Sequence, residues 1–319
     1  MKNPINFVYC IDDNYNLQTA SSILSLLENV SEKINVFILH KTKSDSSFLP
    51  VEILENKKLN KIKVLKFNRN KKSFPNVEGK HVSEATYYRL YLEDYISPSI
   101  YSINFITYLD GDVICLKDPI AEIRKTINDM DQQGFAISVN TETIRNSELE
   151  HRFNSLGMKS NKYFNAGVMV INLNKWCELD IKEKSIEIID KKSQHLELWD
   201  QDVLNACFDS NYFSLSSHMN YRFDMLKFDD FTLEEINNNV TFLHYYGSTK
   251  PWSMKGIIYG YPHHYLDYFK KLRKAEYHIT HKWKRLSFSL LIGSFFDLRF
   301  FKIKNRIRFL RDALISFIS

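Results

Sequence analysis

The stretch INFITYLDGDV, residues 103–113, decides the fold class because it joins a continuous apolar run to a pair of carboxylates. The run 103–109 is typical of a strand buried on both faces of a parallel sheet. Asp110 and Asp112 follow it directly, and at positions i and i+2 of extended chain they project to the same side. Ligands of open α/β sheets bind beyond the carboxyl ends of the strands, so we expect this pair to face a ligand.

The segments around this stretch alternate between strand and helix patterns. INFVYCI (5–11) predicts a buried strand, apolar residues at helical spacing follow over 17–30, and INVFILH (34–40) predicts a second strand. This βαβ order predicts an α/β fold, with a mixed, mainly parallel sheet flanked by helices. Further strands are expected at 61–67, 134–139, 164–173 and 239–247, helices at 83–96, 182–192 and 196–208, and a long polar stretch at 140–162.

Composition indicates a globular protein with an uneven charge distribution. The 319 residues are 44% hydrophobic and 25% charged, which excludes disordered, collagen-like and coiled-coil classes. The net charge is +5, but residues 270–319 carry 13 basic and 3 acidic side chains, so the rest of the chain carries −5. We therefore predict one α/β domain over 1–265 and a basic C-terminal segment over 266–319.

Cysteine spacing and the N-terminal sequence bear on the compartment. The four cysteines are far apart and form no CxxC pair, which indicates neither a zinc cluster nor a disulfide framework. The short apolar run 5–11 is not typical of a secretory signal, and the uncharged stretch 286–296 is too short to span a bilayer. We therefore expect a cytoplasmic protein.

Polar clusters follow several of the predicted strands. Asp110 and Asp112 suit a divalent cation that bridges a diphosphate, although Asp and Gly are also common in turns. His244 ends a late strand, and an imidazole beside two carboxylates would favour Mn²⁺ over Mg²⁺. Gly247 would let the backbone approach a phosphate and Lys250 would supply a positive charge, unless both belong to an ordinary turn.

The remaining polar candidates leave two interpretations open. Asn165, before Ala166 and Gly167, lies at the start of a buried strand, where a glycine marks either a bulge or a ligand. Asp200 and its neighbours open a helix, where acids cap the first turn or bind sugar hydroxyls. Arg89 either pairs with Glu93 on a helix or reaches an anion.

Taken together, six ordered segments carry a family resemblance. The chain resembles the glycosyltransferases of family 8, in particular the bacterial lipopolysaccharide galactosyl- and glucosyltransferases, over roughly residues 5–265. The segments are CIDDNY (10–15), TYYRL (86–90), YLDGDV (108–113), FNAGVMVINLNKW (164–176), WDQDVLN (199–205) and HYYGSTKPW (244–252).

This resemblance implies a GT-A fold, a UDP-sugar donor, Mn²⁺ with Mg²⁺ as the other candidate, and transfer with retention of configuration. It implies that Asp110, Asp112 and His244 bind the metal and that Asp110 also contacts the donor. The other implied contacts are Gly247 and Lys250 with the diphosphate; Cys10, Asp12 and Asn14 with the uridine; and Arg89, Asn165, Ala166, Asp200 and Gln201 with the donor sugar. Asp200 and Gln201 are the predicted catalytic residues.

The expected reaction moves galactose or glucose to a glycan or glycolipid acceptor in cell-surface glycan synthesis. Gln201 is a poor nucleophile, which favours attack on the same face as the leaving group. Asn140 stands where relatives tend to carry an acid, so the acceptor is not specified. Two alternatives stay open: a metal-dependent nucleotidyltransferase, and a non-catalytic membrane-bound protein that binds nucleotide sugars.

The C-terminal segment alternates bases with bulky apolar residues. On one helix, Phe300, Ile303, Ile307 and Leu310 would share a face, as in an amphipathic segment that lies in a membrane surface. We expect it to bind anionic lipid, which places the protein peripherally at the inner face of the cell membrane. Nucleic acid is not expected as a partner, because no binding motif is present, and the open alternative is a helical pair packed on the body.

Overall fold

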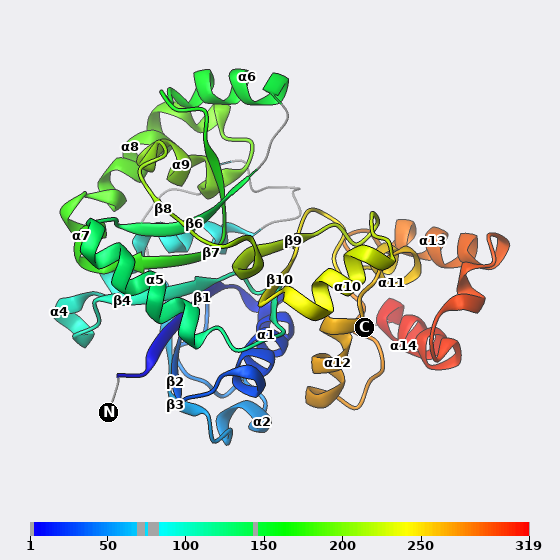
Figure 1. The fold of residues 1–319 in the computed structure, drawn as a ribbon. Coiled ribbons are helices and arrows are strands. Elements are labelled where there is room, and N and C mark those ends of the chain that lie inside the picture. The colour runs from blue at the N-terminus through cyan, green and yellow to red at the C-terminus, as the bar shows by residue number, and fades with distance from the viewer. Residues whose placement is uncertain (1–2, 69–73, 76–82, 143–145, 319) are drawn as a thin grey trace.

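The computed structural model describes residues 3–68, 74–75, 83–142 and 146–318 and contains a seven-stranded mixed sheet (Figure 1). The strand order is β3-β2-β1-β4-β7-β6-β8, and β7 alone runs antiparallel to its neighbours. This arrangement confirms the predicted fold class. The strands are β1 (Ile5–Ile11), β2 (Ile34–His40), β3 (Leu59–Lys66), β4 (Phe105–Leu109), β6 (Ile137–Glu142), β7 (Tyr163–Asn172) and β8 (Phe213–Ser214).

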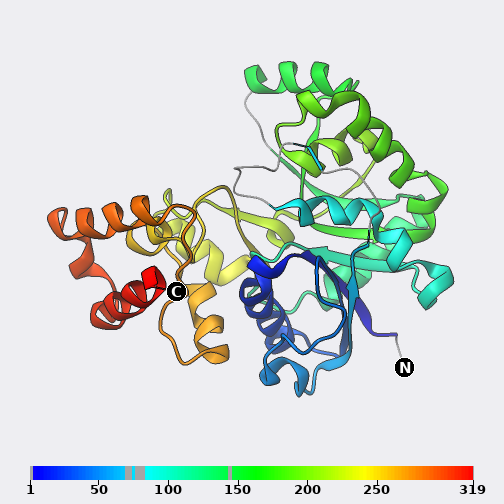
Figure 2. The ribbon, with the colours of Figure 1, turned by 180° about the vertical axis from the view of Figure 1, so that it is seen from behind.

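Helices cover both faces of this sheet because side chains alternate along each strand. In β1, Val8 and Cys10 join the core beneath the helices of residues 84–95 and 173–208, whereas Phe7 and Tyr9 face the opposite core beneath α1. Figure 2 shows the two layers from behind. The first layer holds η2 (Glu84–Tyr91), α3 (Leu92–Tyr95), α7 (Leu173–Glu178), α8 (Ile181–Lys192), η3 (Ser193–His195) and α9 (Trp199–Phe208); the second holds α1 (Asn16–Asn29), α2 (Val51–Leu54) and α5 (Ile120–Gln133). The short elements η1 (Asp13–Tyr15) and α4 (Pro98–Tyr101) and the helix α6 (Asn146–Leu156) complete this part of the chain.

A second, three-stranded sheet places His244 beside the Asp110–Asp112 turn. Its order is β5-β10-β9, with β5 (Val113–Cys115), β10 (Phe242–Tyr245) and β9 (Tyr221–Phe223). Strand β5 starts directly after Asp112, and its first residue pairs with His244 of β10. Two segments about 130 residues apart in sequence therefore meet next to the carboxyl end of β4. The 3-10 helix η4 (Ser217–Asn220) leads from β8 into β9, and α10 (Asp230–Asn239) connects β9 to β10.

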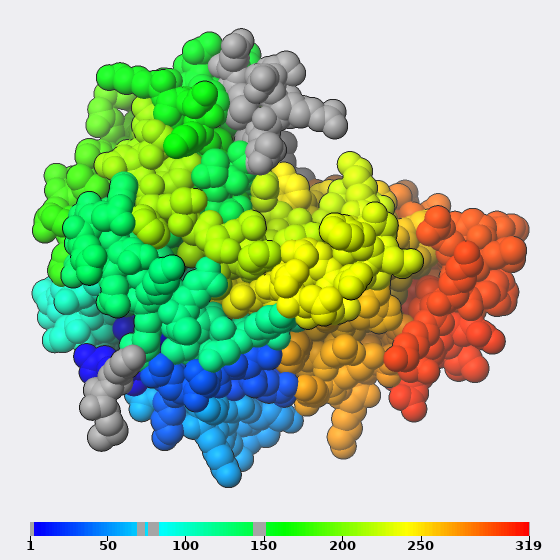
Figure 3. Space-filling model, viewed as in Figure 1, coloured from blue at the N-terminus to red at the C-terminus, as the bar shows by residue number. Residues whose placement is uncertain are grey.

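The C-terminal helices pack on the outer side of the second sheet and form a lobe at one end of the molecule (Figures 1 and 3). They are α11 (Met254–Tyr259), α12 (His263–Leu272), α13 (Lys284–Phe296), η5 (Arg299–Lys302) and α14 (Arg306–Ile318). Leu291, Phe300 and Phe309 share a buried cluster with residues of β10 and α11. The division into 1–265 and 266–319 stays a prediction, and its boundary falls within α12.

The apolar face expected over residues 300–310 does not form. Leu298 and Asn305 take left-handed backbone conformations, with φ of 62° and 53°, and break the segment between α13, η5 and α14. As a result Phe300 is buried, whereas the side chain of Ile307 is 81% exposed. Among the described residues, none belongs to a helix long and apolar enough to cross a membrane.

The predicted secondary structure agrees best where strands are buried. The bounds of β1 and β2 match the predicted ranges 5–11 and 34–40. The helix predicted over 83–96 is instead a 3-10 helix, η2, followed by the single turn α3. The polar stretch 140–162 contains the helix α6, which the sequence reading missed, while residues 143–145 of that stretch lie outside the described residues.

Candidate active site

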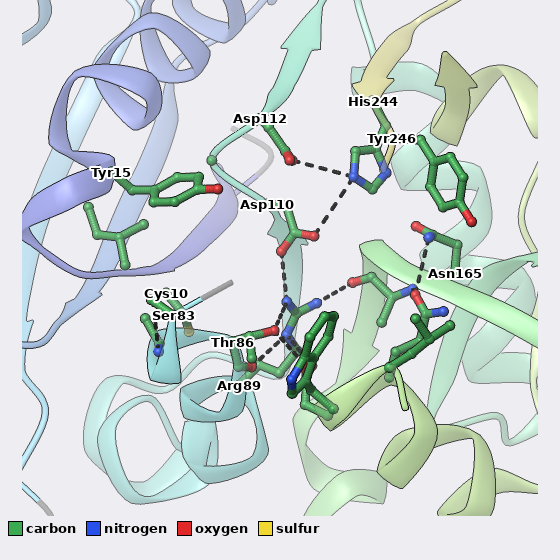
Figure 4. Close-up of a pocket in the computed structure, with 18 of the residues that line it drawn as sticks. Cys10, Tyr15, Ser83, Thr86, Arg89, Asp110, Asp112, Asn165, His244 and Tyr246 are labelled. Atoms are coloured by element: carbon green, nitrogen blue, oxygen red, sulfur yellow. Dashed lines mark hydrogen bonds and ion pairs between the residues drawn. The ribbon is translucent and has the colours of Figure 1, made fainter. Parts of the chain in front are cut away.

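A cavity of about 350 Å³ lies at the carboxyl ends of β1 and β4, beside the start of β7 (Figure 4). Most of the site residues expected from the sequence line it. Asp12 and Asn14 do not line the cavity. The Asp12 carboxylate instead accepts a hydrogen bond from the Asn14 backbone amide and caps η1. The expected residues that line the cavity are Cys10, Arg89, Asp110, Asp112, Asn165, Ala166, Asp200, Gln201, His244, Gly247 and Lys250.

Asp110, Asp112 and His244 meet at the floor of this cavity. One oxygen or nitrogen from each lies within 4.8 Å of the other two. His244 Nε2 is 3.4 Å from Asp112 Oδ1 and 3.9 Å from Asp110 Oδ2, and Figure 4 shows the imidazole pointing at both carboxylates. Asp112 Oδ1 is buried and accepts no hydrogen bond from any residue that the structure describes. Hard oxygen ligands with one imidazole fit a divalent cation, so these three residues can hold one.

Asp110 and Asp112 each contact a basic side chain through the carboxylate oxygen that does not face His244. Asp110 Oδ1 accepts hydrogen bonds from Arg89 at 2.8 Å and from the Tyr108 hydroxyl at 2.6 Å. Asp112 Oδ2 lies 2.6 Å from Lys250 Nζ, which also donates to the Tyr245 carbonyl at 2.7 Å. Burial alone would raise the pKa of Asp112, but the ammonium group of Lys250, the strongest of the opposing groups, holds that pKa below its usual range. Both carboxylates therefore present one oriented oxygen toward His244.

Gly167 of β7 leaves the space that this arrangement needs. A Cβ at that position would lie 2.3 Å from His244 Cε1 and 3.0 Å from Asp110 Oδ2, well inside contact distance. The Gly167 carbonyl also accepts a hydrogen bond from the Asp110 backbone amide at 2.8 Å. The pairing of β7 with β6 is irregular at this position, because Val139 pairs with Met169 and the next residue, Asn140, pairs with Asn165. Gly167 therefore lies in a bulge, one of the two interpretations left open by the sequence, and it also leaves room for the His244 and Asp110 side chains.

Arg89 is buried and contacts three groups on the side of the cavity that lies away from His244. Its guanidinium binds Asp110, lies 2.8 Å from Asp200 Oδ2, and donates to the Ala166 carbonyl at 2.6 Å. Of the two roles left open by the sequence, pairing with Glu93 is not the one observed, and Glu93 Oε1 instead lies 3.6 Å from Lys182 Nζ. Burial raises the pKa of Asp200 to about 6, with Arg89 opposing the rise.

Gln201 is held by the start of β7. Its Oε1 accepts hydrogen bonds from the Ala166 backbone amide and from Asn165 Nδ2, both at 3.1 Å. Asn165 Nδ2 also donates to Glu142 Oε1 at 3.1 Å. The sequence prediction that Asn165, Ala166 and Gln201 lie together at one site is therefore matched by direct contacts between them.

Asp202, one of the acids for which the sequence left a capping role and a sugar-binding role open, shapes the turn that presents Asp200 and Gln201. Its buried carboxylate accepts hydrogen bonds from the backbone amides of Glu197 and Leu198, both at 2.7 Å. Trp199, the first residue of α9, has a φ of 52°, a conformation that bulky residues rarely adopt and that is concentrated at functional sites. These contacts hold that strained turn in place.

Further polar residues at the site were missed by the sequence reading. Thr86 donates to Asp200, Glu142 accepts from Asn165, and Asn220 bonds both His244 and Asn165. None of them belongs to a spacing pattern around the paired carboxylates. Asn220, for example, lies 24 residues before His244, at the end of η4. Thr86 alone had a signal, because it falls in the TYYRL segment.

Comparisons with known proteins show the family of this chain. The family model "Glycosyl transferase family 8" matches residues 6–256. A lipopolysaccharide 1,2-glucosyltransferase of Escherichia coli is 27% identical, over 94% of this chain and 91% of that protein. A lipopolysaccharide 1,3-galactosyltransferase of Salmonella typhimurium is 30% identical, over 79% and 74%.

A solved structure of the galactosyltransferase LgtC, in complex with donor and acceptor sugar analogues, shares the fold. Its TM-score is 0.68 at 23% identity, and the match covers 89% of this chain and all of LgtC. This likeness supports the GT-A fold expected from the sequence.

Proposed function

The chain belongs to glycosyltransferase family 8 and is a hexosyltransferase, and from that premise we propose that it moves galactose or glucose from a UDP-sugar to a glycan acceptor with retention of configuration. The acceptor belongs to lipopolysaccharide, lipooligosaccharide or a related cell-surface glycan. Two relatives named for lipopolysaccharide glucosyl and galactosyl transfer support this substrate class. The family match argues against both alternatives, a nucleotidyltransferase and a non-catalytic binding protein.

One observation carries the proposal: two carboxylates and an imidazole converge on a cavity large enough for part of a nucleotide sugar. The orphaned oxygen of Asp112 indicates that a cation completes the cluster. We propose Mn²⁺ as that cation, because His244 supplies a nitrogen ligand, with Mg²⁺ as the weaker fit. A bound divalent cation would stabilise the negative charge that develops on the departing diphosphate.

The chain's own residues bind and orient the donor. Lys250 neutralises Asp112 and, with a third N–H donor on its ammonium group, can also contact a phosphate oxygen. Gly247 has a φ of 80°, which lets the loop after β10 turn its backbone toward the same phosphates. The uridine lies at the end of β1, near Cys10, Asp12 and Asn14. Cys10 and Tyr15 both line the cavity, which supports this placement.

Retention follows from same-face attack in this proposal. Asp200, which would be the natural nucleophile, is held by Arg89 and Thr86 and is 2% exposed. Gln201 Oε1 already accepts two hydrogen bonds, which lowers its nucleophilicity further. Both residues therefore orient the donor sugar, and the leaving phosphate helps to take the acceptor proton. Mass spectrometry that traps a glycosyl adduct on Asp200 or Gln201 would overturn this part of the proposal.

Donor hydrolysis tests the function. A panel of UDP-sugars with Mn²⁺ and no acceptor should give slow UDP release from one donor. Asp112→Asn should lower that release by at least about 100-fold, whereas Asp118→Asn, six residues away and outside the cavity, should leave it unchanged. If no UDP-sugar binds or is hydrolysed, both the function and the donor-site assignments are wrong.

The lobe formed by the C-terminal helices supports a second part of the proposal, which is peripheral attachment to an anionic membrane at the cytoplasmic face. Among the described residues, 11 of the 18 exposed large apolar side chains lie between Trp283 and Ile318. Exposed bases are interleaved with them, and each base near an anionic surface contributes about 1 kcal/mol to binding. This mixture fits a membrane surface better than nucleic acid.

Liposome flotation with the full-length chain tests this attachment. Removing the tail would open the core, because Phe300 and Phe309 are buried. Surface substitutions avoid that problem. Phe296→Glu and Phe301→Glu together should reduce flotation with anionic vesicles by about tenfold, whereas Phe231→Glu, which is also exposed but lies in α10, should not. Equal flotation of all variants would remove the membrane proposal and leave the hexosyl transfer untouched.

A further inference from the structure

The side-chain amide of Asn220 lies between His244 and Asn165 and contacts both. Asn220 Oδ1 is 3.0 Å from His244 Nδ1, and Asn220 Nδ2 is 2.9 Å from Asn165 Oδ1. All three side chains are at most 5% exposed, so water does not compete for these contacts. Asn220 ends η4 directly before β9, which pairs with the strand of His244. A buried amide thus joins the cation side of the site to its sugar side.

The direction of these hydrogen bonds is fixed by groups whose roles are unambiguous. The Gly167 backbone N–H can only donate, and it lies 3.0 Å from one terminal atom of Asn165, which must therefore be the oxygen. The other terminal atom of Asn165 faces Glu142 Oε1 at 3.1 Å, and a carboxylate accepts. Two independent partners thus assign the Asn165 amide in the same orientation.

The orientation of Asn220 follows from that of Asn165. Because Asn165 Oδ1 is an acceptor, the Asn220 atom that faces it is the amide nitrogen, and Asn220 Oδ1 must face His244. An oxygen acceptor at His244 Nδ1 requires a proton on that nitrogen. In the neutral ring, Nε2 then keeps its lone pair and directs it at Asp110 and Asp112.

We propose that Asn220 is a positioning residue that fixes the ring orientation and the Nδ1–H tautomer of His244, so that Nε2 is ready to bind a divalent cation. The inference deepens the proposed function and rests on it for the identity of the cation. Metal-binding histidines depend on such a partner at the second ring nitrogen, and its loss typically weakens metal binding about 10- to 100-fold. Through Asn165, the same relay ends on Gln201, so cation and sugar contacts share one rigid frame.

Three full-length variants separate this role from a general loss of stability. Asn220→Leu keeps similar volume but removes the acceptor, whereas Asn220→Asp keeps an acceptor at Nδ1 and loses the donor to Asn165. Asn172→Leu is the matched control, since Asn172 is also a buried asparagine whose side chain accepts a backbone hydrogen bond but lies at the far end of β7. Thermal unfolding of all three establishes that they fold.

The first readout is the tautomer of His244 without any metal. Long-range ¹⁵N–¹H correlation spectra of histidine-labelled protein at pH 8, with the His244 signal assigned through His244→Gln, should show a proton on Nδ1 in the wild type and in Asn220→Asp. Asn220→Leu should lose that preference. A wild-type protein with the proton on Nε2 would overturn the proposal.

The second readout is Mn²⁺ affinity, measured from the electron paramagnetic resonance signal of free Mn²⁺ without donor or acceptor. Asn220→Leu should bind about 10- to 100-fold more weakly, Asn220→Asp within a few-fold of wild type, and Asn172→Leu as wild type. Equal affinity of Asn220→Leu and wild type would overturn the proposal. A wild-type protein that binds no Mn²⁺ but shows the Nδ1–H tautomer would contradict the proposed cofactor and leave the role of Asn220 on His244 supported.

Discussion

Gly167→Ala is the smallest substitution that should disable the cation site. The added Cβ would lie 2.3 Å from His244 Cε1, 2.7 Å from His244 Nδ1 and 3.0 Å from Asp110 Oδ2. Ordinary carbon contacts are about 3.5 Å, so the imidazole must retreat by about 1 Å. Metal–ligand distances tolerate only about 0.2 Å. We therefore expect Mn²⁺ affinity to fall by at least about 100-fold, more than the loss of a supporting hydrogen bond causes.

Calorimetric titration with Mn²⁺ and UDP measures this loss directly. The matched control is Gly293→Ala in α13, where a Cβ meets no atom within 4 Å, and this variant should bind as wild type. Overpacking at Gly167 costs about 1–3 kcal/mol, which a protein of ordinary stability survives, and circular dichroism would verify the fold. A folded Gly167→Ala protein that binds Mn²⁺ and UDP with wild-type affinity would refute the placement of His244 and Asp110 in one cation site.

Two further predictions concern buried charge. Arg89→Met should lower the free energy of unfolding, measured in urea, by about 3–5 kcal/mol, because it leaves the buried Asp200 carboxylate without its positively charged partner. Adding Asp200→Asn should restore part of this loss. A loss below about 1 kcal/mol in the single variant would contradict the buried pairing. Burial lowers the pKa of His278 to about 4. Between about pH 6.5 and 4 the unfolded state therefore binds more protons than the folded state. The free energy of unfolding should fall by about 3 kcal/mol as the pH falls through that range. His278→Phe should remove that part of the pH dependence in urea titrations at each pH, and an unchanged slope would count against it.

The sequence predicted what depends on local pattern and missed what depends on tertiary contact. Buried strands such as β1 were predicted with their bounds because an apolar run of that length has few other solutions. Asp110 and Asp112 were predicted to face a ligand because they follow a buried strand, whereas His244, which lies on the second sheet, was joined to them only through the family resemblance. Asn220 carries no such signal, since its function comes only from the neighbours that the fold supplies.

The C-terminal segment, residues 266–319, is a second case in which the sequence pattern was not sufficient. Its basic and apolar composition was evident from the sequence, but the predicted single apolar helix face was wrong, because backbone turns at Leu298 and Asn305 divide the segment into separate helices. Phe300 and Phe309 then stabilise the lobe from inside, while Ile307 is left exposed. Periodicity describes one helix at a time and does not report where the helix ends.

Anomalous diffraction from crystals grown with Mn²⁺ and UDP tests the central claim most directly. We expect one manganese peak within bonding distance of Asp110, Asp112 and His244 Nε2, with the diphosphate of UDP on the same ion and Lys250 beside it. A manganese peak elsewhere, or UDP bound in the cavity with no metal at these three residues, would contradict it.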